Sequence, residues 1–355
     1  MVEYCRMDKK DFFHKNRNTI ICFLVMPILA AVTVYVVFKG SGIPFDELVG
    51  SIRDASPAGI ILAAVCMLGF IYFEGDALRV IVNHMGYGVK RSHGFIYSAA
   101  DVYFSAITPS ASGGQPASAF FMMRDKISAT AVMVALLLNL VMYTLAVVTL
   151  GVADFLIAPQ LYFQFDILSR ILIVCGMVAL LGLAILFYLL LRKQAIVRRI
   201  MKVLSSFLRK IHCRRLAQKL EKKTMEALEE YGQCVNLIFD SRSLLIKVYV
   251  LNLLQRLSQI GVTMIAYMAL HGEKRILPRL LATQIYVVLG SNFVPVPGGV
   301  GVTDYLMLNG YMQLMDKTAA YRLEILSRGL SFYVCIFVSL ITVVIGYLIL
   351  RRKGK

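Results

Sequence analysis

The sequence contains no tryptophan, no Cys-x-x-Cys pair and no phosphate-binding glycine loop. Its seven cysteines are scattered, so neither a disulfide framework nor a thiolate zinc site is expected. The five histidines lack the His-Glu-x-x-His spacing of a metalloenzyme, and no set of Ser, His and Asp indicates nucleophilic catalysis. We therefore expect no metal, no cofactor and no catalytic residue, while leaving an enzymatic role open.

Acidic residues are also scarce, since 38 Lys and Arg stand against 21 Asp and Glu and give a net charge of +17. In a soluble protein this excess would indicate nucleic acid as a partner. Here 58% of the residues are hydrophobic and the mean hydropathy is +0.70, which is typical of an integral membrane protein. Basic loops that face anionic headgroups then account for the charge, and we expect no nucleic-acid partner.

Six apolar segments are long enough to cross a membrane as helices. They cover residues 19–38, 57–73, 127–150, 168–191, 244–270 and 325–350. Basic residues flank both ends of the chain, so we place both termini on the cytoplasmic side of a bacterial-type plasma membrane. Glu74 and Arg79 follow the second segment, and we interpret them as marking the membrane edge.

The segment 192–243 is the most basic part of the sequence, with thirteen Lys and Arg against five acids. Apolar residues recur there at helical spacing between the charges, at Ile196, Ile200, Val203, Phe207 and Ile211. This pattern predicts an amphipathic cytoplasmic helix that lies on the inner leaflet and binds anionic lipids.

Two short stretches interrupt the apolar pattern, and each combines proline with an adjacent pair of glycines. The first consists of Thr108, Pro109, Ser110, Ala111, Ser112, Gly113, Gly114, Gln115 and Pro116. The second contains Pro295, Pro297, Gly298, Gly299 and Gly301. Such residues end helices, and broken backbone at membrane depth is tolerated only inside protein or beside a wet cavity.

The segments that precede these breaks, 94–108 and 280–293, are too short to cross a hydrocarbon core of ~30 Å. We interpret each break as the tip of a re-entrant helical hairpin. The chain 1–355 then forms one all-α polytopic membrane domain of six spans and two hairpins. Its halves, about 19–150 and 168–350, form an inverted repeat. In the alternative topology one or both hairpins cross fully, which gives seven or eight spans.

Charged residues inside membrane segments are candidate site residues, because burial there costs about 2.5–3.5 kcal/mol each. Arg256 lies near the middle of the fifth segment, beside a polar stripe formed by Asn252, Gln255, Gln259 and Thr263. It could clamp a lipid phosphate, or it could bond to carbonyl groups of a broken helix.

Asp304 begins the helix after the second break. It could pair with Arg256, bind a cationic headgroup, or only complement the helix dipole. Glu324 and Arg328 are four residues apart and could pair at the interface. The free N–H groups of helices that start after the breaks suit a phosphate or carboxylate, although small residues there could also serve close packing alone.

With these two breaks, and with Asp304 and Arg328 after the second, the sequence resembles the lysylphosphatidylglycerol synthase transmembrane-region family. This family is the flippase-like module of the multiple peptide resistance factor. The resemblance covers roughly residues 15–350. It implies movement of an anionic or lysyl-modified phosphatidylglycerol between leaflets. Full-length members carry a further cytosolic domain that transfers lysine to the lipid, and we expect this chain to represent the translocase part.

We expect the headgroup to bind between the hairpins, with the two glycine pairs close together near the midplane. The expected substrate-binding residues are Thr108, Pro109, Ser110, Ser112, Gly113, Gly114, Gln115, Arg256, Pro295, Pro297, Gly298, Gly299, Gly301, Asp304 and Arg328. Many family members have an Asp-Arg pair on the helix after the first break, where this chain has Asn139 and no arginine.

Other functions stay open at this point. One is a phosphatidylglycerol lysyltransferase or another lipid-modifying transferase, with a separate catalytic subunit as a partner. Another is a carrier of polyprenyl phosphate or of a small solute. A homo-oligomer is equally compatible with the sequence.

Overall fold

The computed structural model describes residues 45–108, 112–192, 228–292, 294, 299 and 301–353. Within these ranges every regular element is a helix and no strand occurs. The all-α membrane fold expected from the sequence is therefore confirmed. The predicted first span, 19–38, and the apolar stripe at 196–211 lie outside the described residues.

In the part of the chain that the structure describes, four helices are long and apolar enough to cross a membrane. They are α3 (Pro57–His84), α6 (Ala129–Ile157), α8 (Ile167–Arg192) and a continuous helix, Lys317–Leu348. That continuous helix is assembled from α14 (Lys317–Arg328), a π-helical segment η4 (Gly329–Val334) and the first part of α15 (Cys335–Lys353). A further helix, α11 (Arg242–Ala269), has 28 residues and a polar stripe. These five long helices fall on five of the six predicted spans.

Serine side chains start three of the long helices. Ser56 precedes α3 and its Oγ accepts the N–H of Gly59, while Pro57 occupies the first turn. Ser128 and Ser241 cap α6 and α11 in the same way. A serine at this position satisfies an N–H group that the helix itself leaves free, so each start is encoded locally.

The second span is longer than predicted. The apolar run ends at Phe73, but α3 continues to His84, so Glu74 and Arg79 lie within the helix and the membrane-edge interpretation was wrong. Glu74 is only 6% exposed, and Arg79 pairs with Asp76 at 2.6 Å. The helix continues because neighbouring helices cover the polar side chains. Two short helices, α2 (Phe45–Asp54) and α7 (Pro159–Gln164), were not predicted.

Both breaks lie at the tips of helical hairpins, as predicted. The first hairpin is α4 (Arg91–Ile107) with α5 (Gly114–Arg124), and the second is α12 (Leu277–Ser291) with α13 (Val302–Tyr311). The two helices of each hairpin pack against each other. With 17 and 15 residues, α4 and α12 reach about 22–26 Å, too short for a full crossing.

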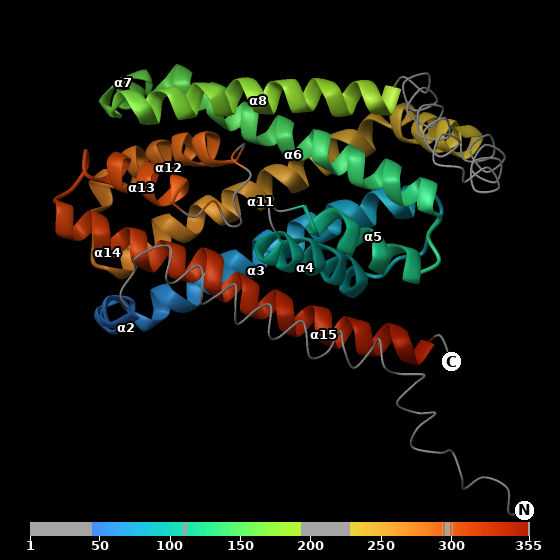
Figure 1. Cartoon of the computed structure of the whole chain (residues 1–355), viewed down its shortest axis with the longest axis horizontal. Coiled ribbons are helices and arrows are strands. Elements are labelled where there is room, and N and C mark those ends of the chain that lie inside the picture. Colours follow the sequence, from blue (N-terminus) through green and yellow to red (C-terminus); the bar gives the residue numbers. More distant parts are fainter. Residues whose placement is uncertain are drawn as a thin grey trace, which may run out of the picture.

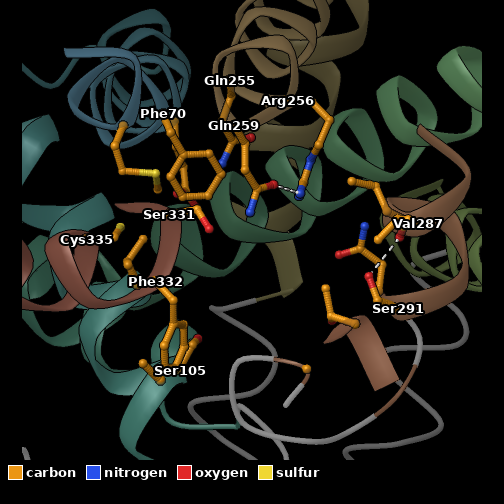
Figure 2. A pocket seen from close by; sticks show the side chains of 18 of the residues that line it. Phe70, Ser105, Gln255, Arg256, Gln259, Val287, Ser291, Ser331, Phe332 and Cys335 are labelled. Atoms are coloured by element: carbon orange, nitrogen blue, oxygen red, sulfur yellow. Dashed lines mark hydrogen bonds between the residues drawn. The ribbon is translucent and has the colours of Figure 1, made fainter. Parts of the chain in front are cut away.

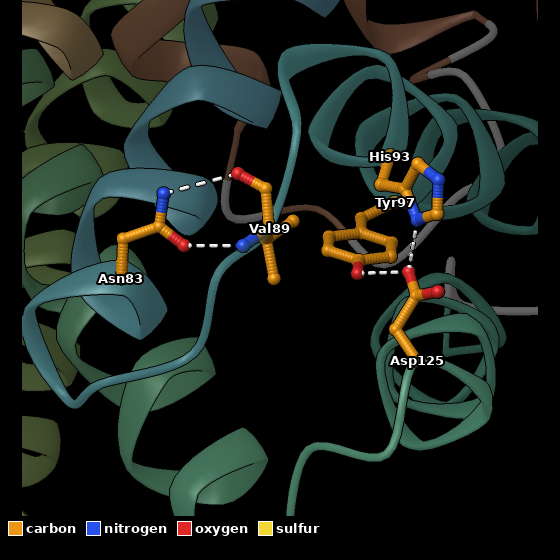
Figure 3. Close-up of polar contacts among 5 residues, drawn as sticks. All are labelled: Asn83, Val89, His93, Tyr97 and Asp125. Carbon is orange, nitrogen blue, oxygen red and sulfur yellow. Dashed lines mark hydrogen bonds and ion pairs between the residues drawn. The ribbon is translucent and has the colours of Figure 1, made fainter.

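The base of the first hairpin is closed by polar contacts (Figure 3). Nδ1 of His93, at the start of α4, lies 2.6 Å from Oδ2 of Asp125, which ends α5. The Tyr97 hydroxyl donates to the same carboxylate oxygen. Asn83 at the end of α3 exchanges two hydrogen bonds with the backbone of Val89, at 2.7 and 3.0 Å. Both ends of this hairpin therefore lie on one side of the bundle.

The hairpins enter the bundle from opposite ends (Figure 1). At one end of the α3–α11 pair, the Ser56 N–H donates to the Ala269 carbonyl at 2.9 Å. At the other end, Nε2 of His84 lies 3.2 Å from the Leu237 carbonyl oxygen, just before α11. The two helices are thus antiparallel with matched ends. Since α4 follows the end of α3 and α12 follows the end of α11, the hairpins are inverted relative to each other.

α3 and α4 cross at a contact between glycines. A Cβ added to Gly75 would lie 2.4 Å from the carbonyl oxygen of Gly94, and one added to Gly94 would lie 2.5 Å from that of Gly75. The two backbones therefore touch, which small residues permit between membrane helices. This contact sets how α4, and with it the first hairpin, lies against α3.

We expect Gly75→Ala to destabilise the protein by about 1–3 kcal/mol, because backbone rather than a flexible side chain occupies the space of the new methyl group. Thermal aggregation of the detergent-purified chain measures this as a lower midpoint. Gly182→Ala on α8 is the matched control, since nothing lies within 4 Å of the added Cβ. Equal midpoints for the two variants would contradict the glycine contact.

Candidate functional site

One polar cavity of about 460 Å³ lies where the two hairpins meet. The first hairpin contributes Ser105 and Gln115, and the second contributes Ser291 and Gly299. Side chains from α3, α6, α11 and the α14–η4–α15 helix complete the lining. Figure 2 shows Arg256 and Gln259 side by side in this wall. The cavity has the size of an ordinary small-molecule site.

Arg256 is the central cation of the wall and is only 4% exposed. Its Nη1 donates to Oε1 of Gln259, and its guanidinium carbon lies 4.3 Å from the ring centre of Tyr143 and 5.9 Å from that of Phe70. Its Nε has no hydrogen-bond partner, and no ion pair joins it to a carboxylate among the described residues. Asp304 pairs with Arg328 instead, so the alternative of an Arg256–Asp304 pair was wrong. Bonding of Arg256 to carbonyl groups of a broken helix stays a prediction, because most residues of the two breaks lie outside the described residues.

Two acids from neighbouring helices form a pair in the same wall. The carboxyl groups of Glu74 on α3 and Asp101 on α4 lie close together in this wall. Ser98 Oγ donates to Glu74 at 2.8 Å, and Gln115 Nε2 donates to Asp101 at 3.1 Å. Sequence reasoning did not include this pair in the site. The available signal was Asp101 itself, an acid inside a short apolar segment.

The second hairpin carries its own charged group. Arg328 Nε lies 2.7 Å from Oδ1 of Asp304, and the Gly301 N–H donates to Oδ2 of the same residue at 2.8 Å. The partner of Asp304 is thus Arg328, and the predicted pairing with Arg256 was wrong. Glu324 is 1% exposed beside this group, and its pairing with Arg328 at the interface stays a prediction. Gly301 has φ of +82°, which favours glycine at the start of α13.

Hydrogen bonds fix the backbone on both sides of the first break. Thr108 Oγ1 donates to the Phe104 carbonyl at 2.6 Å and accepts the Gly113 N–H at 2.9 Å. A Cβ on Gly114 would lie 2.0 Å from Oδ1 of Asp101, so this position admits only glycine without rearrangement. Ser112 is exposed. The threonine and the glycines therefore have a structural role that the sequence did not distinguish from ligand binding.

Four of the predicted site residues line the cavity, namely Gln115, Arg256, Gly299 and Arg328. Five others, Pro109, Ser110, Pro295, Pro297 and Gly298, lie outside the described residues. The predicted closeness of the two glycine pairs stays a prediction for this reason. Binding of a ligand by any of these residues also stays a prediction.

The base of the second hairpin is held to the start of α8. The Tyr305 hydroxyl on α13 donates to Asp166, and the Asp166 N–H donates to Asn309 Oδ1 at 3.1 Å. Partial burial opposes ionisation of this carboxyl, but hydrogen bonds from Ser169 and Tyr305 outweigh it and lower the pKa of Asp166. Asp166 is therefore a charged anchor at the rim, outside the spanning segments.

The structure is that of a polytopic helical membrane protein in which two inverted, broken-helix hairpins enclose a charged cavity. The chain belongs to the family described as Lysylphosphatidylglycerol synthase TM region, which matches residues 19–339. It is therefore a membrane module of the lipid flippase or synthase type. A comparison with curated protein sequences found no match.

We expect a strong energetic coupling between Asp304 and Arg328, whose side chains are 14% and 11% exposed. Removal of one partner leaves the other charge buried and unpaired, which lowers the stability by about 3–5 kcal/mol. The double variant should recover a part of this stability. The exposed pair Asp54–Arg322, with side chains 57% and 54% exposed, is the matched control and should couple by about 1 kcal/mol or less. Unfolding of single and double alanine variants measures both couplings, and equal values would contradict the buried pair.

Proposed function

We propose that this protein is a phospholipid translocase that binds the headgroup of an anionic or lysyl-modified phosphatidylglycerol in the cavity and moves it between leaflets. Arg256 is the observation that carries this proposal. It is a buried cation with a free Nε and no paired carboxylate among the described residues. Such a group is costly at membrane depth, and a lipid phosphate would supply the missing acceptor.

The groups beside Arg256 suit the rest of such a headgroup. Gln255 is 2% exposed, and its Oε1 has no partner, so it is free to accept a glycerol hydroxyl. Gln284 and Ser331 add further polar atoms to the lining. A lysyl headgroup also carries amines, and the acids Glu74 and Asp101, which line the cavity with Arg256, could receive them. The acyl chains would stay in the bilayer.

The same chemistry would serve a polyprenyl phosphate, because Arg256 recognises the phosphate rather than the tail. A phosphatidylglycerol lysyltransferase or another lipid-modifying transferase is the second candidate, since the family description includes a synthase. Such an activity would involve a separate catalytic subunit as a partner. Lipid mass spectrometry after expression in a host without lysyl lipids separates these cases, because only a transferase makes a new lipid.

The cellular setting is part of the proposal. Both termini would be cytoplasmic in a bacterial-type plasma membrane, and the basic segment 192–243 would bind anionic lipids of the inner leaflet. Association of two or more copies of the chain is compatible with this arrangement.

Replacement of Arg256 by glutamine tests the proposal. We expect the transbilayer movement of short-chain fluorescent phosphatidylglycerol in proteoliposomes to slow at least tenfold, since a charge-assisted contact is worth about 1.5–3 kcal/mol. Arg256→Lys should retain part of the rate, because it keeps the charge but loses the planar fork. Lys247→Gln, on an exposed position of the same helix, is the matched control and should leave the rate unchanged.

Leaflet-resolved labelling of cells with and without the protein gives the complementary result. An unchanged distribution of both phosphatidylglycerol and its lysyl form would overturn the translocase proposal. A carrier of polyprenyl phosphate would instead retain a polyprenyl chain on purification, which mass spectrometry detects.

A further inference from the structure

The crossing of α3 and α4 brings two acids together beside the cavity. The Gly75–Gly94 contact lets the helices touch, and Glu74 precedes Gly75 in the sequence. Ser98, one helical turn before Asp101, donates to Glu74 at 2.8 Å. Glu74 is 6% exposed, while Asp101 is half-buried, and both line the cavity. The pair therefore lies at the crossing where the backbones of α3 and α4 touch.

Two carboxylates that line one poorly hydrated wall repel each other when both are ionised. One proton held by Glu74 or Asp101 relieves this repulsion. Their other contacts, from Ser98, Ser105 and Gln115, come from neutral groups. Neither acid forms an ion pair with a basic residue among those described. The pair with one proton carries a net charge of −1.

Two buried groups in the same cavity point independently to a ligand. Arg256 Nε and Gln255 Oε1 have no partner, although their residues are only 4% and 2% exposed. Both residues are drawn in the cavity wall in Figure 2. The arginine is close enough to Glu74 to stabilise its charge, but no salt bridge joins them. The acid pair therefore balances the charge of the arginine, while Nε of the arginine has no acceptor among the described residues.

An anion that enters this cavity changes the charge balance. The singly protonated pair and Arg256 together are neutral, so a phosphate diester adds one uncompensated negative charge in a poorly hydrated space. A second proton, taken from water or buffer onto the remaining carboxylate, restores neutrality. No covalent bond of the lipid changes in this step.

We propose that Glu74 and Asp101 form a proton-binding site, and that binding of an anionic headgroup at Arg256 is coupled to proton uptake by this pair. The coupling rests on the proposed function, because it takes the headgroup as the ligand at Arg256. Linkage is reciprocal, so a lower pH strengthens headgroup binding, by up to about tenfold per pH unit. A proton gradient across the membrane then biases headgroup movement.

Other titratable groups face the pair or the cavity. Tyr143 on α6 and Cys335 on α15 act on Glu74 electrostatically, and both types are ordinarily neutral between about pH 5 and 8. The Asp304–Glu324–Arg328 group, of which Arg328 lines the cavity, is the competing proton acceptor. The experiment must therefore distinguish the two acid groups.

Calorimetric titration of the full chain in detergent with short-chain phosphatidylglycerol tests the coupling. Two buffers of equal near-neutral pH but different heats of ionisation, such as PIPES and imidazole, report protons taken up on binding. We expect about one proton per headgroup for the wild type. The double variant Glu74→Gln/Asp101→Asn should still bind the lipid but take up almost no proton, because neither carboxylate of the pair remains. Glu324→Gln should keep the uptake.

Asp154→Asn is the matched control, because Asp154 is a 6% exposed acid that does not line this cavity. It should bind lipid with the same proton uptake as the wild type. Binding without uptake in the wild type overturns the coupling and leaves the proposed function intact, and this readout needs no variant. If proton uptake is lost only in Glu324→Gln, the proton binds the Asp304–Glu324–Arg328 group instead, and this result also overturns the coupling. Absence of wild-type binding in both buffers overturns the proposed function itself.

Discussion

A guanidinium held away from water is the constraint on which the centre of this structure depends. In a membrane interior no solvent is present to stabilise Arg256, so the protein brings compensation from several helices. Tyr143 and Phe70 offer ring faces, Gln259 accepts one hydrogen bond, and Glu74 lies near without forming an ion pair. This compensation is incomplete at Nε among the described residues, which is why we propose an anion as the ligand of the cavity.

The inverted arrangement of the hairpins follows from the same requirement. A broken helix at membrane depth must have its free backbone groups inside protein, and two hairpins from opposite ends give each other that cover. Polar contacts hold each hairpin at its own base, through His93 and Asp125 at one rim and through Asp166 and Tyr305 at the other. With their bases anchored in this way, both hairpins contribute residues to the cavity that Arg256 lines.

The positions of the spans and the breaks could be predicted from the sequence, because apolar length and Pro-Gly chemistry are local properties. The pairings between charged side chains could not. An apolar run stops at the first charge, so Glu74 was placed outside the helix that buries it. Asp304 and Arg328 lie on different helices, and only the packing of α13 against α14 selects that pair over Arg256. Such choices depend on three-dimensional neighbours that one-dimensional spacing does not specify.

The π-helical segment Gly329–Val334 interrupts the long helix directly after Arg328. A π turn takes in one residue more than an α turn, so side chains beyond it are rotated by about 100° from the phase of a continuous α-helix. The helix thus presents one stripe before the segment, where Arg328 meets Asp304, and a differently phased stripe after it, where Cys335 and Ile336 line the cavity. The π-helical turn therefore decides which side chains of this helix reach the cavity, because Arg328 before it and Cys335 and Ile336 after it line the same wall.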